Sequence, residues 1–351
     1  MAILDSGVNR AAPTRASMLA AAMLAVAIVA PLAAVHAQEA SPQAVPADVD
    51  VTIRLAQSQK NYETLDAAAK AARQLGKYDT AQKLMEAALA IRAQVAGEQS
   101  VEYGVGLIKL AEVEQKSDPK SAGNLYARAS RILGDRPEAA RALTHLGLAA
   151  LQKPDFAQAF EYFQHVQLVD PAQAGKALMW MAVVRQREKN MEEADRLYQS
   201  AIAASDPHSM DASITMLVYA GFLRSQGRQD QAGEVSKRAA AIRKENEKPL
   251  PALPEDVYRI AHGVAAPRPV KRPEPEYSDE ARGALLQGTV VLRVVVGTDG
   301  LVHDAQVVRG IGLGLDENAI EAVNQWQFQP ASKDGQPVKV VAAIEVNFRL
   351  F

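Results

Sequence analysis

The stretch VKVVAAIEVNFRL, residues 338–350, alternates between two sets of side chains along one predicted strand. One set is apolar and consists of Val338, Val340, Ala342, Ile344, Val346, Phe348 and Leu350. The other set is Lys339, Val341, Ala343, Glu345, Asn347 and Arg349. This period of two predicts a strand that packs its apolar face on a core. At ~3.3 Å per residue the strand would run roughly 40 Å, so we expect part of it to project beyond its neighbours as an unpaired edge.

The residues before this strand predict a helix followed by a hairpin. A short helix is expected over residues 278–286, because Ser278 is a good capping residue and acidic side chains follow it. Residues 289–296 (TVVLRVVV) are mostly β-branched and apolar, and residues 297–300 (GTDG) carry a glycine suited to positive φ. Residues 301–309 then return as the second strand of the hairpin.

A second helix is predicted between the hairpin and the last strand. Asp316 is expected to cap it, and its apolar stripe has steps of three and four residues, through Leu315, Ala319, Val323 and Trp326. The turn Asp334-Gly335 leads into the last strand. Residues 271–351 are therefore predicted to form a small α+β domain with an antiparallel sheet and two helices.

The glycine-rich stretch GIGLG, residues 310–314, lies between a strand and a helix and could suggest a dinucleotide-binding loop. The sixth position of that fingerprint is Leu315 instead of glycine, and the strand before it belongs to an antiparallel hairpin. We interpret residues 310–314 as a flexible connection, and no cofactor is expected.

The order of these elements, with particular residues at particular places, resembles the C-terminal domain of TonB-family energy transducers. The matching positions are Tyr277, Ala281, Gly288-Thr289-Val290, Asp299-Gly300, Leu315-Asp316, Trp326, Phe328, Pro330, Gly335 and Pro337. The resemblance implies a periplasmic domain that pairs its last strand with a short peptide, the Ton box, of an outer-membrane TonB-dependent transporter. It nominates a peptide-binding edge strand at Val338, Val340, Val341, Ala343, Glu345, Asn347 and Arg349, mainly through its backbone.

The sequence departs from the transducer pattern in the part that would couple to a motor. The N-terminal apolar run has no internal histidine, and helical repeats largely replace the long Pro-rich spacer. We therefore expect a cell-envelope binding protein that supports transmembrane transport. The alternatives are a membrane-anchored energy transducer that contacts an inner-membrane motor complex, and a periplasmic scaffold that forms a homodimer through its last strand.

Residues 49–247 are rich in Ala, Leu, Gln, Arg and Glu at helical spacing and predict an all-helical region. A unit with a turn signal, an aromatic or Met residue and an alanine recurs, most clearly at residues 146–171, and resembles the tetratricopeptide repeat. Its alanines lie at positions 81, 122, 159, 194 and 232, so successive copies are 35 to 41 residues apart. About five stacked repeats predict a solenoid with a concave face. The aromatic residues Trp180, Tyr198, Tyr219 and Phe222 are expected to pack between helices.

Residues 248–270 are rich in proline and predict an extended linker to the domain that begins at residue 271. Within it, Val257-Tyr258-Arg259-Ile260 is suited to a short strand that docks on a neighbour. The basic cluster Arg268, Lys271 and Arg272 is interpreted as a solvated face, with a membrane or nucleic-acid contact as the weaker alternative.

Residues 1–37 have the features of an export signal. Arg10 and Arg15 precede the apolar run at residues 18–30, and small residues around Ala37 favour cleavage before Gln38. The predicted location is the periplasm. The alternative is an uncleaved anchor in the inner membrane, because residues 16–37 are about long enough to span a bilayer.

Composition excludes several other classes of protein. Among 351 residues, 39 Lys and Arg nearly balance 41 Asp and Glu, so no bulk charge favours nucleic acid, and the absence of cysteine excludes disulfides and thiolate metal sites. The histidines are scattered, and no metal-binding or serine-hydrolase motif is present. We nominate no catalytic, metal-binding or cofactor-binding residue, and the protein is not expected to be an enzyme. The six histidines are His36, His145, His165, His208, His262 and His303.

Overall fold

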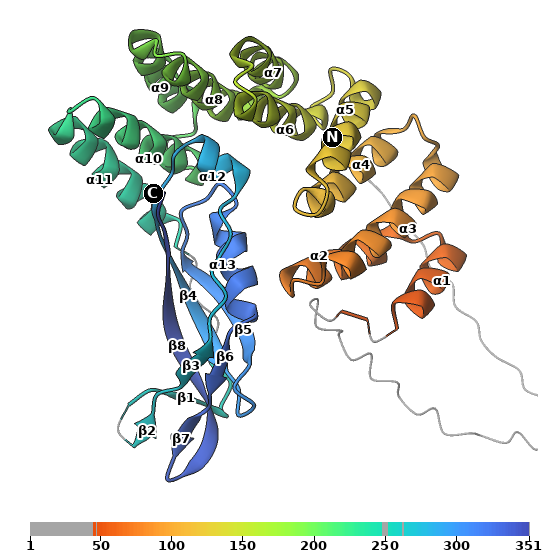
Figure 1. Cartoon of the computed structure of the whole chain (residues 1–351), viewed down its shortest axis with the longest axis vertical. Helices are drawn as coiled ribbons and strands as arrows, with labels where there is room; N and C mark the ends of the chain where they lie inside the picture. The colour runs from red at the N-terminus through yellow and green to blue at the C-terminus, as the bar shows by residue number, and fades with distance from the viewer. Residues whose placement is uncertain (1–44, 47, 248–251, 262, 351) are drawn as a thin grey trace, which may run out of the picture. The chain divides into compact units, whose positions relative to one another are not determined.

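The computed structural model describes residues 45–46, 48–247, 252–261 and 263–350. The expected export signal or anchor at residues 1–37 lies outside these ranges. Within them, no helix combines the length and the apolar character that crossing a lipid bilayer requires. The chain first forms a series of helices and then a mixed part with strands β1 to β8 (Figure 1).

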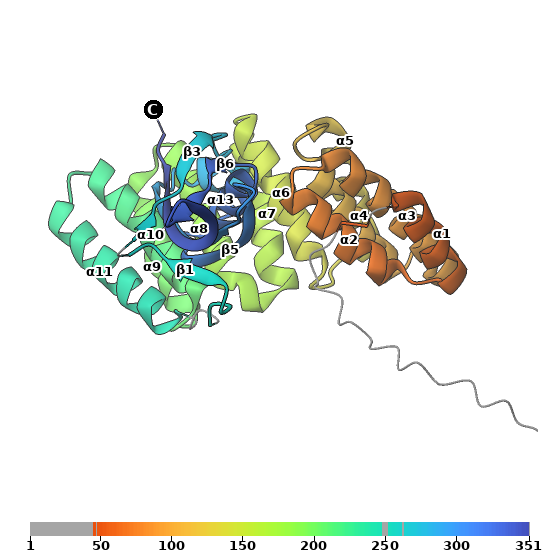
Figure 2. The same ribbon diagram turned by 90° about the horizontal axis from the view of Figure 1, so that it is seen from below.

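The helical part consists of antiparallel pairs that follow one another in chain order, with α1 at one end and α11 at the other (Figure 2). After α1 (Val49–Gln59), the pairs are α2 (Tyr62–Gln74) with α3 (Tyr78–Ala96), α4 (Val101–Glu114) with α5 (Pro119–Leu133), α6 (Ala139–Gln152) with α7 (Phe156–Val169), α8 (Ala174–Arg187) with α9 (Met191–Ala204), and α10 (Met210–Ser225) with α11 (Gln229–Glu245). A 3₁₀ turn, η1 (Pro171–Gln173), precedes α8. This arrangement confirms the predicted tetratricopeptide-like solenoid.

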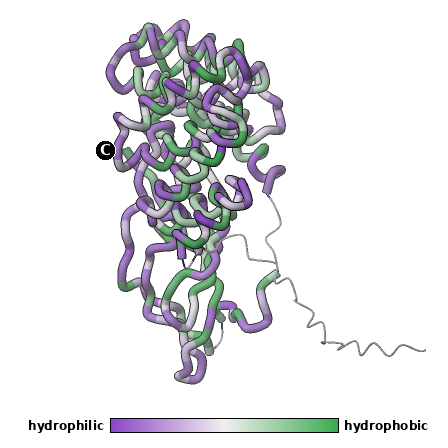
Figure 3. Tube along the Cα trace, turned by 90° about the vertical axis from the view of Figure 1, so that its right-hand side faces the viewer, coloured by the Kyte–Doolittle hydropathy of each residue, from purple (hydrophilic) through white to green (hydrophobic). Residues whose placement is uncertain are grey.

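The recurring alanines mark the second helix of each pair and are completely buried. Ala81, Ala122, Ala159, Ala194 and Ala232 each have 0% of their surface exposed. A small side chain at this position lets the two helices of a pair approach closely. Hydrophobic residues recur along the helices of the repeats (Figure 3).

Aromatic side chains fill the space that the small residues leave. A Cβ atom added to Gly147 would lie 2.7 Å from the ring of Phe163, so this ring packs directly on the backbone of α6. Phe163 in turn stacks on Trp180, with 5.7 Å between the ring centroids. Trp180, Tyr198, Tyr219 and Phe222 are all buried, which confirms the prediction that they pack between helices.

The C-terminal sheet has the strand order β2-β7-β8-β4-β5, and β1 pairs separately with β8. A second, two-stranded sheet joins β3 to β6. The strands are β1 (Val257–Arg259), β2 (Val264–Ala265), β3 (Arg268–Lys271), β4 (Gly288–Val296), β5 (Val302–Arg309), β6 (Gln327–Gln329), β7 (Ala331–Lys333) and β8 (Gln336–Phe348). The predicted hairpin is confirmed as β4 and β5, and the predicted final strand as β8.

The β4–β5 turn depends on glycine at position 300. Gly300 has φ +77°, and a Cβ atom there would lie 2.0 Å from the carbonyl oxygen of Phe328. The N–H of Phe328 donates to the Gly300 carbonyl at 2.8 Å, which ties the turn to β6. Only glycine combines this conformation with this close approach.

Helices α12 (Asp279–Gly283) and α13 (Leu315–Asn324) are the two predicted helices of the domain. Ser278 caps α12 as expected, by accepting the N–H of Ala281 at 3.0 Å. The prediction that Asp316 caps α13 is wrong, because Gly314 occupies the N-cap position. Asp316 lies inside the first turn and accepts the N–H groups of Ile311 at 2.7 Å and Gly312 at 3.2 Å.

Helix α13 lies along β4 and β5 and packs its apolar stripe into the domain core (Figure 1). Leu315, Ala319 and Val323 have 0% exposure and Trp326 has 6%, so the predicted stripe is confirmed. The Trp326 indole N–H donates to the Pro273 carbonyl at 3.1 Å, and the Arg272 guanidinium lies 4.5 Å from the ring centroid. This contact accounts for one member of the basic cluster Arg268, Lys271 and Arg272.

Candidate functional site

Strand β8 is paired with β4 on one side along most of its length, and with β1 on the opposite side over only three residues. Residues 340–348 pair antiparallel with β4, from Val296 opposite Val340 to Gly288 opposite Phe348. Strand β7 pairs with residues 336–338, before the stretch that β4 covers, and on the side opposite β4, β1 pairs with residues 339–341. Among the described residues no strand pairs with this side of Ala342–Phe348, which we call the open stretch.

The two faces of β8 differ in burial as the alternation predicts. Val340, Ile344, Val346 and Phe348 are buried, whereas Ala343, Glu345 and Asn347 are exposed. An open stretch with one face on the core is held in a fixed register, since a slip by one residue would move its apolar side chains into solvent. Its backbone is thus presented in one defined conformation.

The nominated edge residues fall into three groups. Val338 lies opposite Ala331 of β7, and Val340 and Val341 lie opposite Tyr258 and Arg259 of β1. The remaining nominated residues lie on or beside the open stretch: Ala343, Glu345 and Asn347 within it, and Arg349 just past the end of β8. The role of these seven residues in peptide binding stays a prediction.

The far end of the open stretch is anchored by aromatic packing. The rings of Tyr277 and Phe348 meet edge to face, with 5.6 Å between centroids, and Tyr277 donates its hydroxyl hydrogen to the Leu286 carbonyl at 2.6 Å. Burial raises the pKa of Tyr277, so this hydroxyl stays protonated and able to donate. The Thr289 hydroxyl also bonds to the side-chain oxygen of Asn347 at 2.7 Å.

Strand β1 is held on β8 by few contacts besides its pairing. Asp256, just before β1, accepts a hydrogen bond from Lys339 at 2.6 Å, and this bond lowers the pKa of Asp256. The Lys333 ammonium lies 4.7 Å from the ring centroid of Tyr258. Both contacts are exposed to solvent, where ion pairs contribute little to stability.

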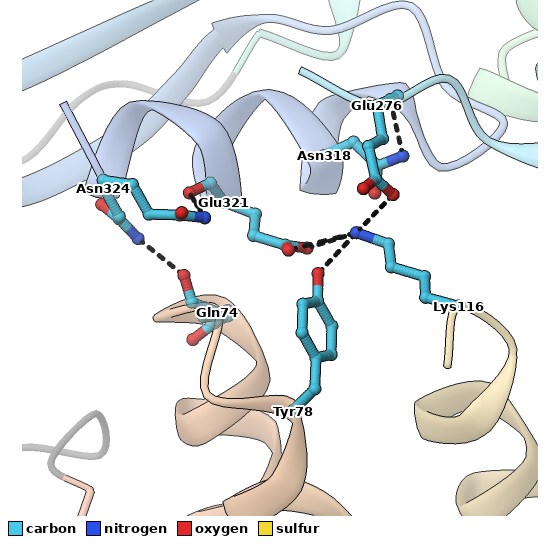
Figure 4. A network of polar contacts seen from close by, with 8 residues as sticks. Gln74, Tyr78, Lys116, Glu276, Asn318, Glu321 and Asn324 are labelled. Atoms are coloured by element: carbon cyan, nitrogen blue, oxygen red, sulfur yellow. Dashed lines mark hydrogen bonds and ion pairs between the residues drawn. The ribbon is translucent and has the colours of Figure 1, made fainter. Parts of the chain in front are cut away.

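The domain also contacts the helical repeats, through the polar face of α13. Lys116, after α4, bonds to both carboxylate oxygens of Glu321 at 3.1 and 3.2 Å, to Glu276 at 3.1 Å and to the Tyr78 hydroxyl (Figure 4). Asn324 donates to the carbonyl of Gln74 at 3.3 Å. Helix α13 therefore packs its apolar face on the sheet and turns its polar face to the repeats.

One carboxylate and one histidine near this contact have shifted pKa values. Burial raises the pKa of Glu321 to about 7, and Arg73 acts in the opposite direction. Burial lowers the pKa of His145 to about 4, and its ring stacks on Tyr126 with 4.4 Å between centroids. Asp279 of α12 accepts a hydrogen bond from Gln115 at 2.9 Å.

The histidines that the structure describes do not converge. His165 pairs with Asp135, His208 with Glu245 and His303 with Asp299, each at an exposed position of its own. His36 and His262 lie outside the described residues. Within the ranges that the structure describes, no group of three or more His, Asp or Glu side chains is placed to hold a metal ion.

The sequence did not reveal strand β7, or the contacts that the helical repeats make with the C-terminal domain. The short β7 has no alternation long enough to identify it. A signal for the contact with the repeats exists in the polar residues Asn318, Glu321 and Asn324 at helical spacing, but this pattern is equally typical of a solvated face.

The comparisons with known proteins agree with the geometry of the C-terminal part. Residues 273–350 match the family described as Gram-negative bacterial TonB protein C-terminal, and residues 62–95 match the tetratricopeptide repeat. The chain is 33% identical over 78 residues to Protein TonB of Vibrio cholerae serotype O1, which covers 22% of this chain and 32% of that protein. It is 34% identical over 79 residues to Protein tonB2 of Pseudomonas aeruginosa, covering 22% of this chain and 29% of that protein. The chain thus spans about a third of the length of these relatives.

Similar solved structures cover the helical part. BtubC (BKLC) from P. vanneervenii has 18% identity and a TM-score of 0.47, and covers 60% of this chain and 92% of that chain. MamA has 18% identity and a TM-score of 0.36, and covers 50% of this chain and 94% of that chain. The chain therefore carries a TonB C-terminal domain after tetratricopeptide-like helical repeats.

Proposed function

We propose that this chain is a cell-envelope binding protein whose C-terminal domain captures an extended peptide by strand addition. The peptide class is the Ton-box-like N-terminal segment of an outer-membrane TonB-dependent transporter, and the capture supports transport across the outer membrane. The observation that carries the proposal is the open stretch of β8, which presents one row of backbone groups without a partner strand in the described chain. The match to the family described as Gram-negative bacterial TonB protein C-terminal, at residues 273–350, covers this same part of the chain.

Strand addition suits this edge for two reasons. An extended peptide satisfies backbone donors and acceptors along the edge, which supplies affinity independent of sequence. The exposed face of the open stretch carries Ala343, Glu345 and Asn347, which would contact alternate side chains of the peptide. We expect the Glu345 carboxylate to favour a basic residue at the facing position of the peptide.

Two neighbouring alanines allow a matched test of the edge. Ala342 and Ala343 are adjacent, so in a strand their N–H groups point to opposite sides, one towards β4 and the other towards the open side. A proline removes the N–H at its position. We expect one of the variants Ala342→Pro and Ala343→Pro to weaken β4 pairing and lower the melting temperature. The other should keep more of its stability and bind transporter N-terminal peptides at least about tenfold more weakly, a loss of ~1.4 kcal/mol.

Isothermal titration with a panel of such peptides, together with thermal unfolding of each variant, measures both effects. Wild-type binding that persists unchanged in the more stable proline variant would defeat the strand-addition proposal. The same open edge also fits a second copy of this chain. If sedimentation shows that the wild type is a dimer and that the more stable proline variant is a monomer, the result would favour the scaffold that forms a homodimer through its last strand over peptide capture.

The proposed location is the periplasm, after removal of the export signal. Expression in a Gram-negative host followed by mass measurement of the intact protein tests this prediction. A mature chain that begins at Gln38 is expected. A chain that retains residues 1–37 and fractionates with the inner membrane would favour the anchored transducer, with a motor complex as its further partner.

A further inference from the structure

Strand β1 differs from the other described strands of its sheet in direction. It comes from the segment that joins the repeats to the C-terminal domain, and it pairs parallel with β8, whereas β2, β4, β5 and β7 all pair antiparallel with their neighbours. Its register places Val257 opposite Lys339 and Arg259 opposite Val341. A strand added from outside the domain core therefore already lies on the edge of β8.

The position of β1 limits how long a captured peptide can be while β1 stays in place. The open stretch begins at Ala342, directly after the last residue that β1 covers. Seven residues of strand extend for about 23 Å at ~3.3 Å each. A peptide that pairs further towards the start of β8 would occupy the same backbone groups of Lys339–Val341 that β1 now uses.

The contacts between β1 and β8 are few enough for an incoming peptide to replace β1. It has three paired residues, all of them partly or fully exposed, and its ion pair to Lys339 is open to solvent. Four residues separate it from β2, which pairs antiparallel with β7. A released β1 thus stays tethered beside the edge, and short flexible tethers give effective concentrations in the millimolar range.

We propose that β1 is an internal ligand of the β8 edge, which an incoming extended peptide displaces from Lys339–Val341. This proposal rests on the proposed function, because it assigns the regulation of the same edge. The full accepting edge then runs over residues 339–348, and the closed state with β1 docked exposes only the open stretch. Because a long peptide must displace β1, its apparent affinity is lower than it would be for a free edge. A short peptide that binds only the open stretch does not compete with β1, so its affinity is nearly unchanged.

A disulfide that locks β1 on β8 tests the displacement. The chain has no native cysteine, so no other disulfide can form. The pair Arg259→Cys with Val341→Cys joins directly opposed residues of β1 and β8. The pair Ala265→Cys with Ser332→Cys locks β2 on β7 and serves as the control, since it fixes the same segment without covering β8. Neighbouring strands lie about 4.8 Å apart, within the range that a disulfide bridges.

Each locked protein is compared with its own reduced form in titrations with a ten-residue transporter N-terminal peptide. We expect oxidation to weaken binding at least tenfold in the β1 lock and less than twofold in the control. Equal affinity of the oxidised and reduced β1 lock would overturn the proposal. Hydrogen exchange gives a second measurement, because peptide binding to the wild type should speed exchange at residues 257–259.

A peptide in trans separates this inference from the proposed function. The probe is the synthetic heptapeptide Glu255–Ala261, added to full-length protein in which residues 257–259 are replaced by Gly-Ser-Gly. We expect saturable NMR shifts at the amides of residues 339–341 in this variant and none in the wild type. Such shifts support the internal ligand even if no transporter peptide binds, which would then count against the proposed function alone. No shifts in the replaced variant would overturn the inference.

Discussion

At the scale of single residues, the clearest electrostatic feature is the partly buried imidazole of His145. The ring stacks on Tyr126 at an interplanar angle of 5°, and burial outweighs the opposite influence of Glu280 to lower its pKa to about 4. In the unfolded chain the same group titrates near its usual value of 6.5. Between these pH values the unfolded state binds a proton that the folded state excludes.

The sign of the pH dependence follows from this difference. The stabilising contribution is fully present above pH about 6.5 and is lost as the pH falls towards 4, because the unfolded state then binds more protons. The loss should reach about 1–3 kcal/mol. His145→Phe keeps a ring on Tyr126 and removes the titration. Denaturant unfolding between pH 7 and pH 4 should show a smaller loss of stability in this variant, whereas parallel curves for both proteins would contradict the assignment.

At the scale of elements, the joint between β5 and α13 depends on one carboxylate. Asp316 accepts two backbone N–H groups from the glycine-rich connection before the helix, and Gly310 leaves room for that carboxylate, because a Cβ there would meet its oxygen atoms. Hydrogen bonds from backbone amides to a charged group are stronger than those between neutral groups. The connection is therefore held in place and is more than a flexible spacer.

Two adjacent acids make this joint testable. Asp316→Ala should lower the free energy of unfolding by about 1.5–3 kcal/mol, because two backbone donors lose a charged acceptor. Glu317→Ala removes the same charge from the same first turn, where the helix dipole favours acids, and should cost at most about 1 kcal/mol. Urea denaturation of both variants measures the difference. Equal losses would show that Asp316 acts only through its charge.

Some elements were predictable from sequence because their signals are long. The β-branched run of β4, the alternation of β8 and the stripe of α13 each extend over nine or more residues. Strands β1, β2, β6 and β7 have two or three residues each, too few to show a period, and their pairing partners are set by tertiary contacts. The docking of residues 257–259 was predicted from local composition, but its site on β8 depends on register that sequence does not contain.

At the scale of the whole molecule, the repeats and the C-terminal domain share packed contacts. The described residues from 45 to 350 belong to one compact unit, and one hydrophobic cluster includes both Trp180 of α8 and Ala281 of α12. Lys116 is the polar centre of this contact, since it bonds to Glu321, Glu276 and Tyr78 (Figure 4). Part of the surface that the repeats would offer to another protein is thus occupied by the chain itself.

The Lys116–Glu321 pair predicts a measurable coupling between the two parts. The Glu321 side chain is only 13% exposed, so removing either partner leaves the other poorly compensated. A double-mutant cycle with Lys116→Ala and Glu321→Gln at pH 8 should give an interaction energy of about 1–2 kcal/mol in the free energy of unfolding. The fully exposed pair Lys237–Glu234 on α11 is the matched control and should give an interaction energy close to zero, because solvent screens it. Similar interaction energies for both pairs would mean that the Lys116–Glu321 pair does not couple the repeats to the C-terminal domain.

The parallel placement of β1 has a mechanical consequence. Along the chain, β1 lies in series between the last helix of the repeats, α11, and the sheet that carries the open stretch. If β1 is displaced as proposed above, a pulling force that draws the sheet away from the repeats would act on β1 and help to remove it from Lys339–Val341. Load would then lengthen the edge available to a captured peptide, so that tension strengthens the grip, as in a catch bond.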